Sequence, residues 1–291
     1  MRKRYIILTL GLAFFGLFYA CTKNTNPSTS VTDTVTITKI DTLTVPPPPD
    51  STVNLTKGLL LYLNFNGSIA DSSGNNNPTE AVGGNVLTYD AHGYANSAFG
   101  GNGTGQRILV TNNGSIKFDT AFTLSYDFMI NASARQAMVS MINTSNGDAP
   151  SFLASTSMPG LPNLDFAVSD VSKSCDSIDV GTLPNVGDTS FIPQLNTWYN
   201  VIDIYYKGSV ATYVNGQLTT FVQGNGTAAL LCPESQVVIG GWWNGDPITL
   251  NGKLDEVRLY NRVLTPHEIV TLSQHFQVTS ESVTRKATKG W

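Results

Sequence analysis

Charged residues are scarce in this sequence, and basic residues are the scarcer kind. Only 13% of the residues are charged, with 17 lysines and arginines against 21 aspartates and glutamates. Without Arg2, Lys3 and Arg4, which precede an apolar N-terminal segment, 14 basic residues face 21 acidic ones, a net charge of about −7. This balance argues against nucleic-acid binding, which needs a basic surface. A hydrophobic content of 41% is enough for a buried core.

Glutamate and histidine are also rare, which limits the chemistry open to the chain. The five glutamates are so far apart that no two share a predicted strand. The three histidines, His92, His267 and His275, have neither the spacing of metal ligands nor a paired nucleophile. The sequence therefore offers no catalytic or metal-binding motif built on these residue types.

The N-terminus is expected to be an export signal. Arg2, Lys3 and Arg4 precede an apolar run that ends at Ala20, shorter than the roughly 20 residues of a membrane span. Leu17–Cys21 resembles the cleavage site of bacterial lipoproteins. The resemblance implies that Cys21 carries lipid chains, which together give durable anchoring in the cell envelope, with the outer membrane as the expected location. The alternative is an ordinary signal peptide that ends near a cysteine.

A stalk and one domain are expected after this signal. Residues 22–55 are rich in Thr, Ser, Asn and Val, and include four consecutive prolines, which favour an extended spacer. We therefore divide the chain into a signal peptide (1–20), a lipidated cysteine and stalk (21–55), a globular domain (56–277) and a polar tail (278–291).

The globular part has the pattern of an all-β protein. Apolar runs of about five to eight residues recur between turn signals, and Phe122–Phe128 alternates cleanly. Asn215-Gly216 predicts a tight hairpin, because both residues tolerate a positive φ. One short helix is expected after Thr265, where Pro266 and Glu268 complete a capping box.

Segments at both ends of this region resemble a known family. Tyr62–Gly67 with Asp71–Asn76, and Asn251–Thr265, are similar to the two ends of a laminin-G-like domain of the concanavalin A-like lectin/glucanase fold. The resemblance implies a jelly-roll β-sandwich of two antiparallel sheets. Such domains mostly bind glycans or extracellular proteins, and some relatives are attached to hydrolases, so the function must be argued from the site.

Catalysis is not expected. Glucanases that this fold resembles carry a Glu-x-Asp-x-x-Glu strand motif, which the sequence lacks. The adjacent Asp255 and Glu256 are expected to point to opposite faces of a strand, where they cannot serve one substrate bond. An active site assembled from two aspartates of distant loops stays open as an alternative.

A disulfide is expected between Cys175 and Cys232. These are the two cysteines that remain when Cys21 is lipidated, and the exported compartment is oxidising. The alternative is two unrelated free thiols.

The expected ligand surface lies on Trp242 and Trp243. Both sit in a turn-rich segment, where an indole can stack on the apolar face of a sugar ring while Asn244 and Asp246 bond its hydroxyl groups. Tyr94 is a weaker third aromatic candidate, and Trp198 is expected in the core because it opens a strand. In the alternative reading, one of the two adjacent tryptophans plugs the end of the sandwich and the other covers it.

A structural calcium ion is expected near the terminal strands of the domain. Asp71, in a loop rich in Asn and Gly, and Asp255 offer carboxylates, and Ca²⁺ takes six to eight oxygen ligands. The equally weighted alternative is that Asp71 forms an Asx turn while Asp255 or Glu256 pairs with an arginine.

The sequence as a whole predicts a lipid-anchored protein of the cell envelope that presents a carbohydrate-binding module. A protein-binding adhesion module is the first alternative. A structural envelope component without a ligand and a glycoside hydrolase of the same fold complete the set.

Overall fold

The computed structural model describes residues 52–143, 150–156, 163–175, 185–188, 191–232, 235–242 and 247–274, with the backbone alone at 143, 150 and 185–188. The predicted signal peptide, Cys21, the stalk up to residue 51 and the polar tail lie outside the described residues. Within the described part, no helix is both long and apolar enough to cross a membrane.

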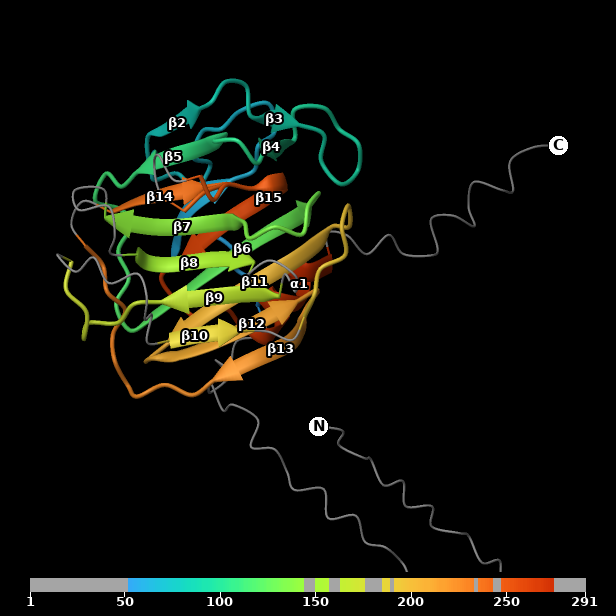
Figure 1. Ribbon diagram of the computed structural model, residues 1–291. Helices are drawn as coiled ribbons and strands as arrows, with labels where there is room; N and C mark the ends of the chain where they lie inside the picture. Colours follow the sequence, from blue (N-terminus) through green and yellow to red (C-terminus); the bar gives the residue numbers. More distant parts are fainter. Residues whose placement is uncertain are drawn as a thin grey trace, which may run out of the picture. The chain divides into compact units, whose positions relative to one another are not determined.

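Two antiparallel sheets form the domain, with the seven-stranded sheet in front of the eight-stranded one in Figure 1. The eight-stranded sheet has the order β13 (Gln217–Val222), β12 (Ser209–Val214), β11 (Tyr199–Tyr206), β6 (Ala121–Ile130), β15 (Asn251–Tyr260), β4 (Ala98–Asn102) and β3 (Leu87–Thr88), and β1 (Leu59–Leu63) also pairs with β15. The seven-stranded sheet has the order β10 (Asn185–Asp188), β9 (Leu164–Val168), β8 (Pro150–Thr156), β7 (Ala137–Asn143), β14 (Ser235–Ile239), β5 (Arg107–Thr111) and β2 (Thr79–Val82). The predicted all-β sandwich is confirmed.

The main core lies between the two sheets. On β6, Phe122, Leu124, Tyr126 and Phe128 alternate into it, as the sequence pattern predicts. Phe122 stacks on Tyr205 of β11, with 5.5 Å between the ring centroids. Each such buried aromatic or aliphatic side chain contributes roughly 1.5–3 kcal/mol relative to an exposed one. The alternation on β6 therefore fixes which residues of this strand face away from the core.

The outer face of the eight-stranded sheet is divided into two halves. One half is apolar and is covered by the helix α1 (Pro266–Ser273), whose Ile269 and Leu272 pack against Ile202 and Tyr260 of the sheet. The helix begins as predicted, because the Thr265 side chain and Glu268 form the capping box and Pro266 occupies the first turn. The other half is polar and lies outside this helix-covered cluster.

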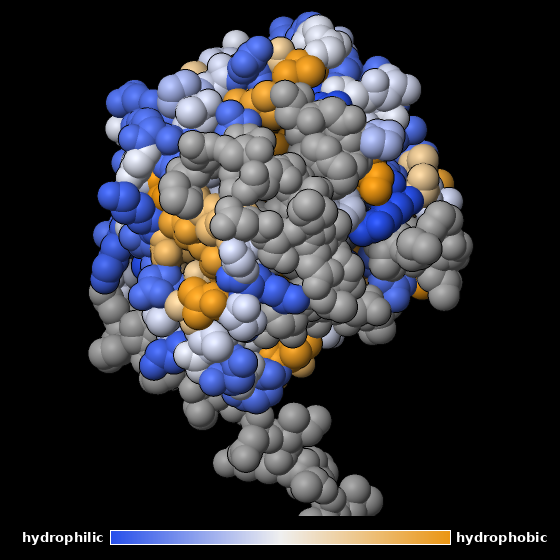
Figure 2. Space-filling model, turned by 60° about the vertical axis from the view of Figure 1, so that its left-hand side comes forward, coloured by the Kyte–Doolittle hydropathy of each residue, from blue (hydrophilic) through white to orange (hydrophobic). Residues whose placement is uncertain are grey.

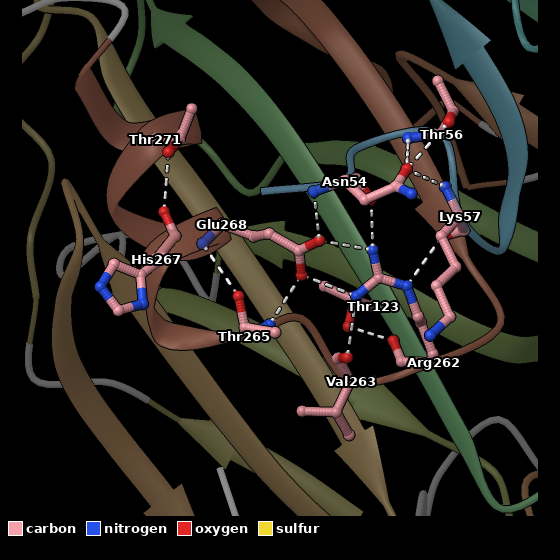
Figure 3. A network of polar contacts seen from close by, with 10 residues as sticks. All are labelled: Asn54, Thr56, Lys57, Thr123, Arg262, Val263, Thr265, His267, Glu268 and Thr271. Atoms are coloured by element: carbon pink, nitrogen blue, oxygen red, sulfur yellow. Dashed lines mark hydrogen bonds and ion pairs between the residues drawn. The ribbon is translucent and has the colours of Figure 1, made fainter. Parts of the chain in front are cut away.

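An ion pair between Arg262 and Glu268 joins the two ends of the domain (Figure 3). Two guanidinium nitrogens of Arg262 donate to the two carboxylate oxygens of Glu268, at 2.7 and 2.8 Å. The same guanidinium donates to the carbonyl oxygens of Asn54 and Lys57, and the Asn54 N–H donates to Glu268. We call this group the terminal clamp, because it holds the segment before β1 against the turn that leads from β15 to α1.

Cys175 and Cys232 form a disulfide, the pairing that the sequence predicts. Their Cα atoms lie 5.6 Å apart, and 57 residues separate them in the sequence. Leu230 packs beside the bond in a small cluster of its own. The bond links the segment after β9 to the segment before β14.

Candidate functional site

Three polar residues lie side by side on the polar half of the eight-stranded sheet. Asn200 of β11 pairs with Asp127 of β6, and Asp127 pairs on its other side with Asp255 of β15. The residues on both sides of Asp127 and of Asn200, and Leu254 before Asp255, pack in the core, so these three side chains point to the outer face. The Asn200 Nδ2 donates to the Asp127 Oδ1 at 2.7 Å. We call these residues the acid row.

A β-bulge adds a third carboxylate to this face. The pairing of β15 with β6 shifts between Asp255 and Arg258, and Glu256 adopts a φ of 53°, in the left-handed region. The Glu256 carboxylate accepts a hydrogen bond from the Tyr62 hydroxyl at 2.8 Å and forms an ion pair with Arg258. The prediction that Asp255 and Glu256 point to opposite faces is wrong, because the bulge breaks the strict alternation of the strand.

Burial sets the electrostatics of the acid row. Asp127 is 1% exposed and Asp255 9%. Burial raises the pKa of Asp127 well above its usual range, and the neighbouring Asp255 carboxylate raises it further. Burial, together with Glu256 and Asp90, raises the pKa of Asp255 to about 8. Arg258 lowers the pKa of both, but its own ion pair is with Glu256.

The loop between β3 and β4 brings two exposed aromatic rings to the border of this face. Tyr89 is 58% exposed and Tyr94 68%, and they are the two exposed large aromatic side chains in the described part of the chain. The Asp90 Oδ1 accepts the N–H groups of His92 and Tyr94, at 2.9 and 2.8 Å, which holds the loop in a tight turn. We call residues 89–94 the aromatic loop.

Lys253 ties the aromatic loop to β15. Its Nζ donates to the carbonyl oxygen of Tyr89 at 2.9 Å, two residues before Asp255 on the strand. Asp90 is also close enough to Asp255 to raise its pKa. Exposed rings and hydrogen-bonding side chains therefore lie together at one end of β15, as a site for a polar ligand with apolar faces requires.

Trp198 does not lie in the core where the sequence analysis expects it. It is half-buried and belongs to none of the apolar clusters of the domain. Its neighbour Tyr199 packs against the core instead, where its ring meets Phe128 and Phe191. The strand alternation starts one residue later than the tryptophan, which the sequence pattern alone does not reveal.

The structure places the predicted ligand residues in different settings. Trp242 is only 7% exposed and packs against the outer face of the seven-stranded sheet, with the Arg135 guanidinium 5.0 Å from its ring centroid. This tryptophan therefore does not present a free ring face. Trp243, Asn244 and Asp246 lie outside the described residues. Tyr94 is exposed, and it is joined by Tyr89, which the sequence analysis missed.

Asp71 accepts four hydrogen bonds and forms the Asx turn that the sequence analysis gives as the alternative to calcium binding. Its Oδ1 accepts the N–H groups of Tyr62 and Ser73, and its Oδ2 accepts the backbone N–H and the Nδ2 of Asn77, at 2.8–3.1 Å. Burial acts to raise the pKa of this carboxyl, but these donors outweigh it and lower the pKa below the usual value. Among the described residues, no three His, Cys, Asp or Glu side chains gather in a way that suits a metal ion. Calcium binding by Asp71 and Asp255 stays a prediction.

Comparisons with known proteins agree with this architecture. The model of the family described as the concanavalin A-like lectin/glucanases superfamily matches residues 102–270. Domain 4 of AbnA, an extracellular arabinanase from Geobacillus stearothermophilus solved with arabinotriose, is similar with a TM-score of 0.55 and 21% identity over 74% of this chain and 98% of its own. The comparison with curated proteins found no match.

Toxin domains share the same fold. The binding domain of Paraclostridial Mosquitocidal Protein 1 has a TM-score of 0.57 and 19% identity, over 76% of this chain and 53% of that one. The receptor binding domain of botulinum neurotoxin D has a TM-score of 0.55 and 16% identity, over 76% and 53%. This chain therefore spans about half the length of these toxin domains, and the likeness concerns the fold.

Proposed function

Because the chain belongs to the concanavalin A-like lectin/glucanase superfamily, we propose that its β-sandwich is a non-catalytic carbohydrate-binding module, carried by a lipid-anchored protein of the bacterial cell envelope. The aromatic loop is the observation that carries this proposal. Tyr89 and Tyr94 offer exposed rings for the apolar faces of sugars, beside the polar groups of Asp90 and Lys253. Domain 4 of AbnA, which was solved with arabinotriose, supports a glycan as the ligand class.

The carboxylates near the loop support binding without catalysis. Hydrolysis of a glycosidic bond requires two carboxyl groups that flank the bond, about 5–9.5 Å apart. Asp127 is buried beneath the surface, and Glu256 is held by Arg258 and Tyr62. Of the three sheet carboxylates Asp127, Asp255 and Glu256, Asp255 is the one close to the aromatic loop, where the Asp90 carboxylate already accepts the N–H groups of His92 and Tyr94.

The lipid anchor rests on Cys21 and the apolar segment before it. Lipid chains on this cysteine hold a protein at a membrane without a spanning helix. The proline-rich segment that follows favours an extended spacer between the anchor and the module. We place the module on the bacterial envelope on this basis, with the outer membrane as the proposed location.

An adhesion module that binds protein is the second candidate, and the toxin receptor-binding domains of the same fold favour it. A protein interface of this kind needs a broad apolar patch. On the face drawn in Figure 2, hydrophobic residues are visible at several places among hydrophilic ones.

A glycan array with the purified full chain tests the proposal. We expect binding to at least one glycan, and a loss of affinity of about tenfold or more in Tyr89→Ala and in Tyr94→Ala, because each substitution removes a stacking surface. Tyr206→Ala is the matched control. This half-buried tyrosine lies at the end of β11 that is opposite to Asn200 of the acid row. Full affinity in both loop variants, or release of reducing ends from a bound polysaccharide, would contradict the proposal.

A further inference from the structure

A second loop lies against the aromatic loop. Residues 64–70, which follow β1, form this second loop, and the Gly67 N–H donates to the carbonyl oxygen of Asn96 at 2.8 Å. We call residues 64–70 the amide loop. Asn66 directly precedes the bonded Gly67, and Asn96 follows Tyr94 by two positions, which a chain spans in at most about 7 Å. The two asparagines therefore lie at the border of the aromatic loop.

The side chains of Asn66 and Asn96 are exposed and uncommitted. Neither side-chain amide forms a hydrogen bond with another described residue, whereas the Oδ1 of Asn64 accepts the backbone N–H of Asn66 at 3.2 Å. An asparagine amide offers an acceptor oxygen and two donor hydrogens, and a sugar hydroxyl both donates and accepts. Two uncommitted amides beside exposed aromatic rings therefore match the hydroxyl groups and the apolar face of a sugar ring.

The backbone holds both asparagines in tight turns. Phe65 is fully buried and has a φ of 51°, in the left-handed region that a bulky residue rarely adopts. Its ring packs near that of Phe99 on β4, with 6.4 Å between the ring centroids. Asn96 is also left-handed, with a φ of 58°. The core contacts of Phe65 therefore support the strained turn that exposes Asn66, and such strain is often found where a protein binds a ligand.

The charges at the two loops oppose an anionic ligand. Residues 64–70 and 89–97 contain no lysine or arginine, and Asp90 gives them a carboxylate. On the neighbouring strand β15, Lys253 donates to a backbone carbonyl oxygen of the aromatic loop, and Arg258 is paired with a glutamate. The carboxylate or sulfate group of an acidic glycan is best held by an uncommitted arginine or lysine. The loops therefore suit a glycan without charge.

We propose that Asn66 and Asn96 bind the hydroxyl groups of a neutral glycan, one of whose sugar rings stacks on the aromatic loop. This inference rests on the proposed function and narrows it, because it adds the amide loop to the site and names the ligand as uncharged. The tyrosines provide the stacking surface, and the asparagines select hydroxyl groups by hydrogen bonds. The Asp90 carboxylate disfavours acidic glycans, because like charges repel at short range.

A glycan array at pH 8, where histidine is neutral, tests both parts with the purified full chain. The array carries neutral arabinans, xylans, glucans and mannans, together with polygalacturonate and its carboxyl-reduced, uncharged form. We expect every glycan whose binding weakens in Tyr89→Ala and Tyr94→Ala to be uncharged. For such a glycan, Asn66→Asp and Asn96→Asp should each lower the affinity about tenfold, because the substitution removes the amide donors.

Two further sets of variants control for charge and folding. Asn66→Ala and Asn96→Gly add no charge and should show the same loss, and glycine tolerates the positive φ at position 96. Asn131→Asp is the matched control, because Asn131 is exposed after β6 and its side chain also forms no hydrogen bond with a described residue. This control should keep full affinity. The urea midpoint of each variant shows whether it is folded.

The outcomes separate this inference from the proposed function. An array on which no glycan binds contradicts carbohydrate binding itself, and the inference falls with it. Binding that depends on both tyrosines but is unchanged in the folded variants of Asn66 and Asn96 overturns the role of the asparagines. Binding of polygalacturonate that depends on both tyrosines overturns the neutral ligand class. In these last two cases the carbohydrate-binding function stands.

Discussion

Asp203 of β11 provides the sharpest test of the energetics of this core. Its neighbours Val201 and Tyr205 belong to the main cluster, so its carboxyl also points between the sheets. The Thr212 hydroxyl donates to its Oδ1 at 2.6 Å, and the Tyr126 hydroxyl is a second partner. Its Oδ2 has no partner among the described residues. Burial raises the pKa of this carboxyl to about 7, and the two hydroxyl groups lower it only in part.

The sign of the pH effect follows from this raised pKa. The unfolded carboxyl has a pKa of about 3.9, so between pH 4 and 7 the folded protein holds a proton that the unfolded chain has lost. The contribution of this proton to the free energy of unfolding is complete below pH 4, and it is lost as the pH rises through 7. The gap of about three pKa units corresponds to roughly 4 kcal/mol, with a slope approaching 1.4 kcal/mol per pH unit.

Urea unfolding of the wild type and of Asp203→Asn at several pH values from 5 to 8 checks this reasoning. The amide cannot ionise, so we expect the difference between the two proteins to shift in favour of the variant by a few kcal/mol as the pH rises. The comparison cancels the other buried acids, including Asp127 and Asp255, because both proteins contain them. Exposed Asp119→Asn should follow the wild type. Parallel profiles for the wild type and Asp203→Asn would refute the argument.

Three further outcomes are expected. Glu268→Ala leaves Arg262 without its buried partner and should lower the free energy of unfolding by about 3 kcal/mol in urea, and an unchanged midpoint would count against the terminal clamp. Replacing Cys175 and Cys232 together by Ser should cost roughly 4 kcal/mol on the loop-entropy account, and free thiols at these positions in the unreduced protein would rule the bond out. Cys21→Ser should move the protein from the membrane fraction to the soluble one, and continued membrane retention would argue against lipidation.

Local patterns of the sequence predict much of the fold. The alternation of Phe122–Phe128, the Asn215-Gly216 turn between β12 and β13 and the capping box at Thr265 are each decided by neighbours in sequence, and each is present in the structure. Such features depend on backbone propensity and on the period of apolar residues, which a single sequence shows directly.

The candidate site was harder to predict because it depends on long-range register. Asp127, Asn200 and Asp255 come from three strands, and they become neighbours only when the pairing of β6 with β11 and β15 is known. A polar residue in an otherwise apolar strand, such as Asp127, was the available signal. The bulge at Glu256 had no such signal, since a non-glycine residue with a positive φ is held there by surrounding contacts.

The exposure of aromatic residues was equally invisible in the sequence. Trp242 and Tyr89 both stand in turn-rich segments, but one packs against a sheet under Arg135 and the other points to solvent. Hydrophobicity favours the larger tryptophan for either role, because a large ring can cover a sheet or bind a ligand. The neighbouring side chains decide between the two, and only the folded structure brings them together.

We expect stability and ligand binding to depend on opposite ends of β15. At its C-terminal end the strand leads into the terminal clamp, where the chain enters the domain at Asn54. At its N-terminal end, Lys253 holds the aromatic loop, seven residues and roughly 20 Å before Tyr260. A clamp variant should therefore lose stability while a folded fraction keeps its glycan affinity, whereas a loop variant should show the reverse.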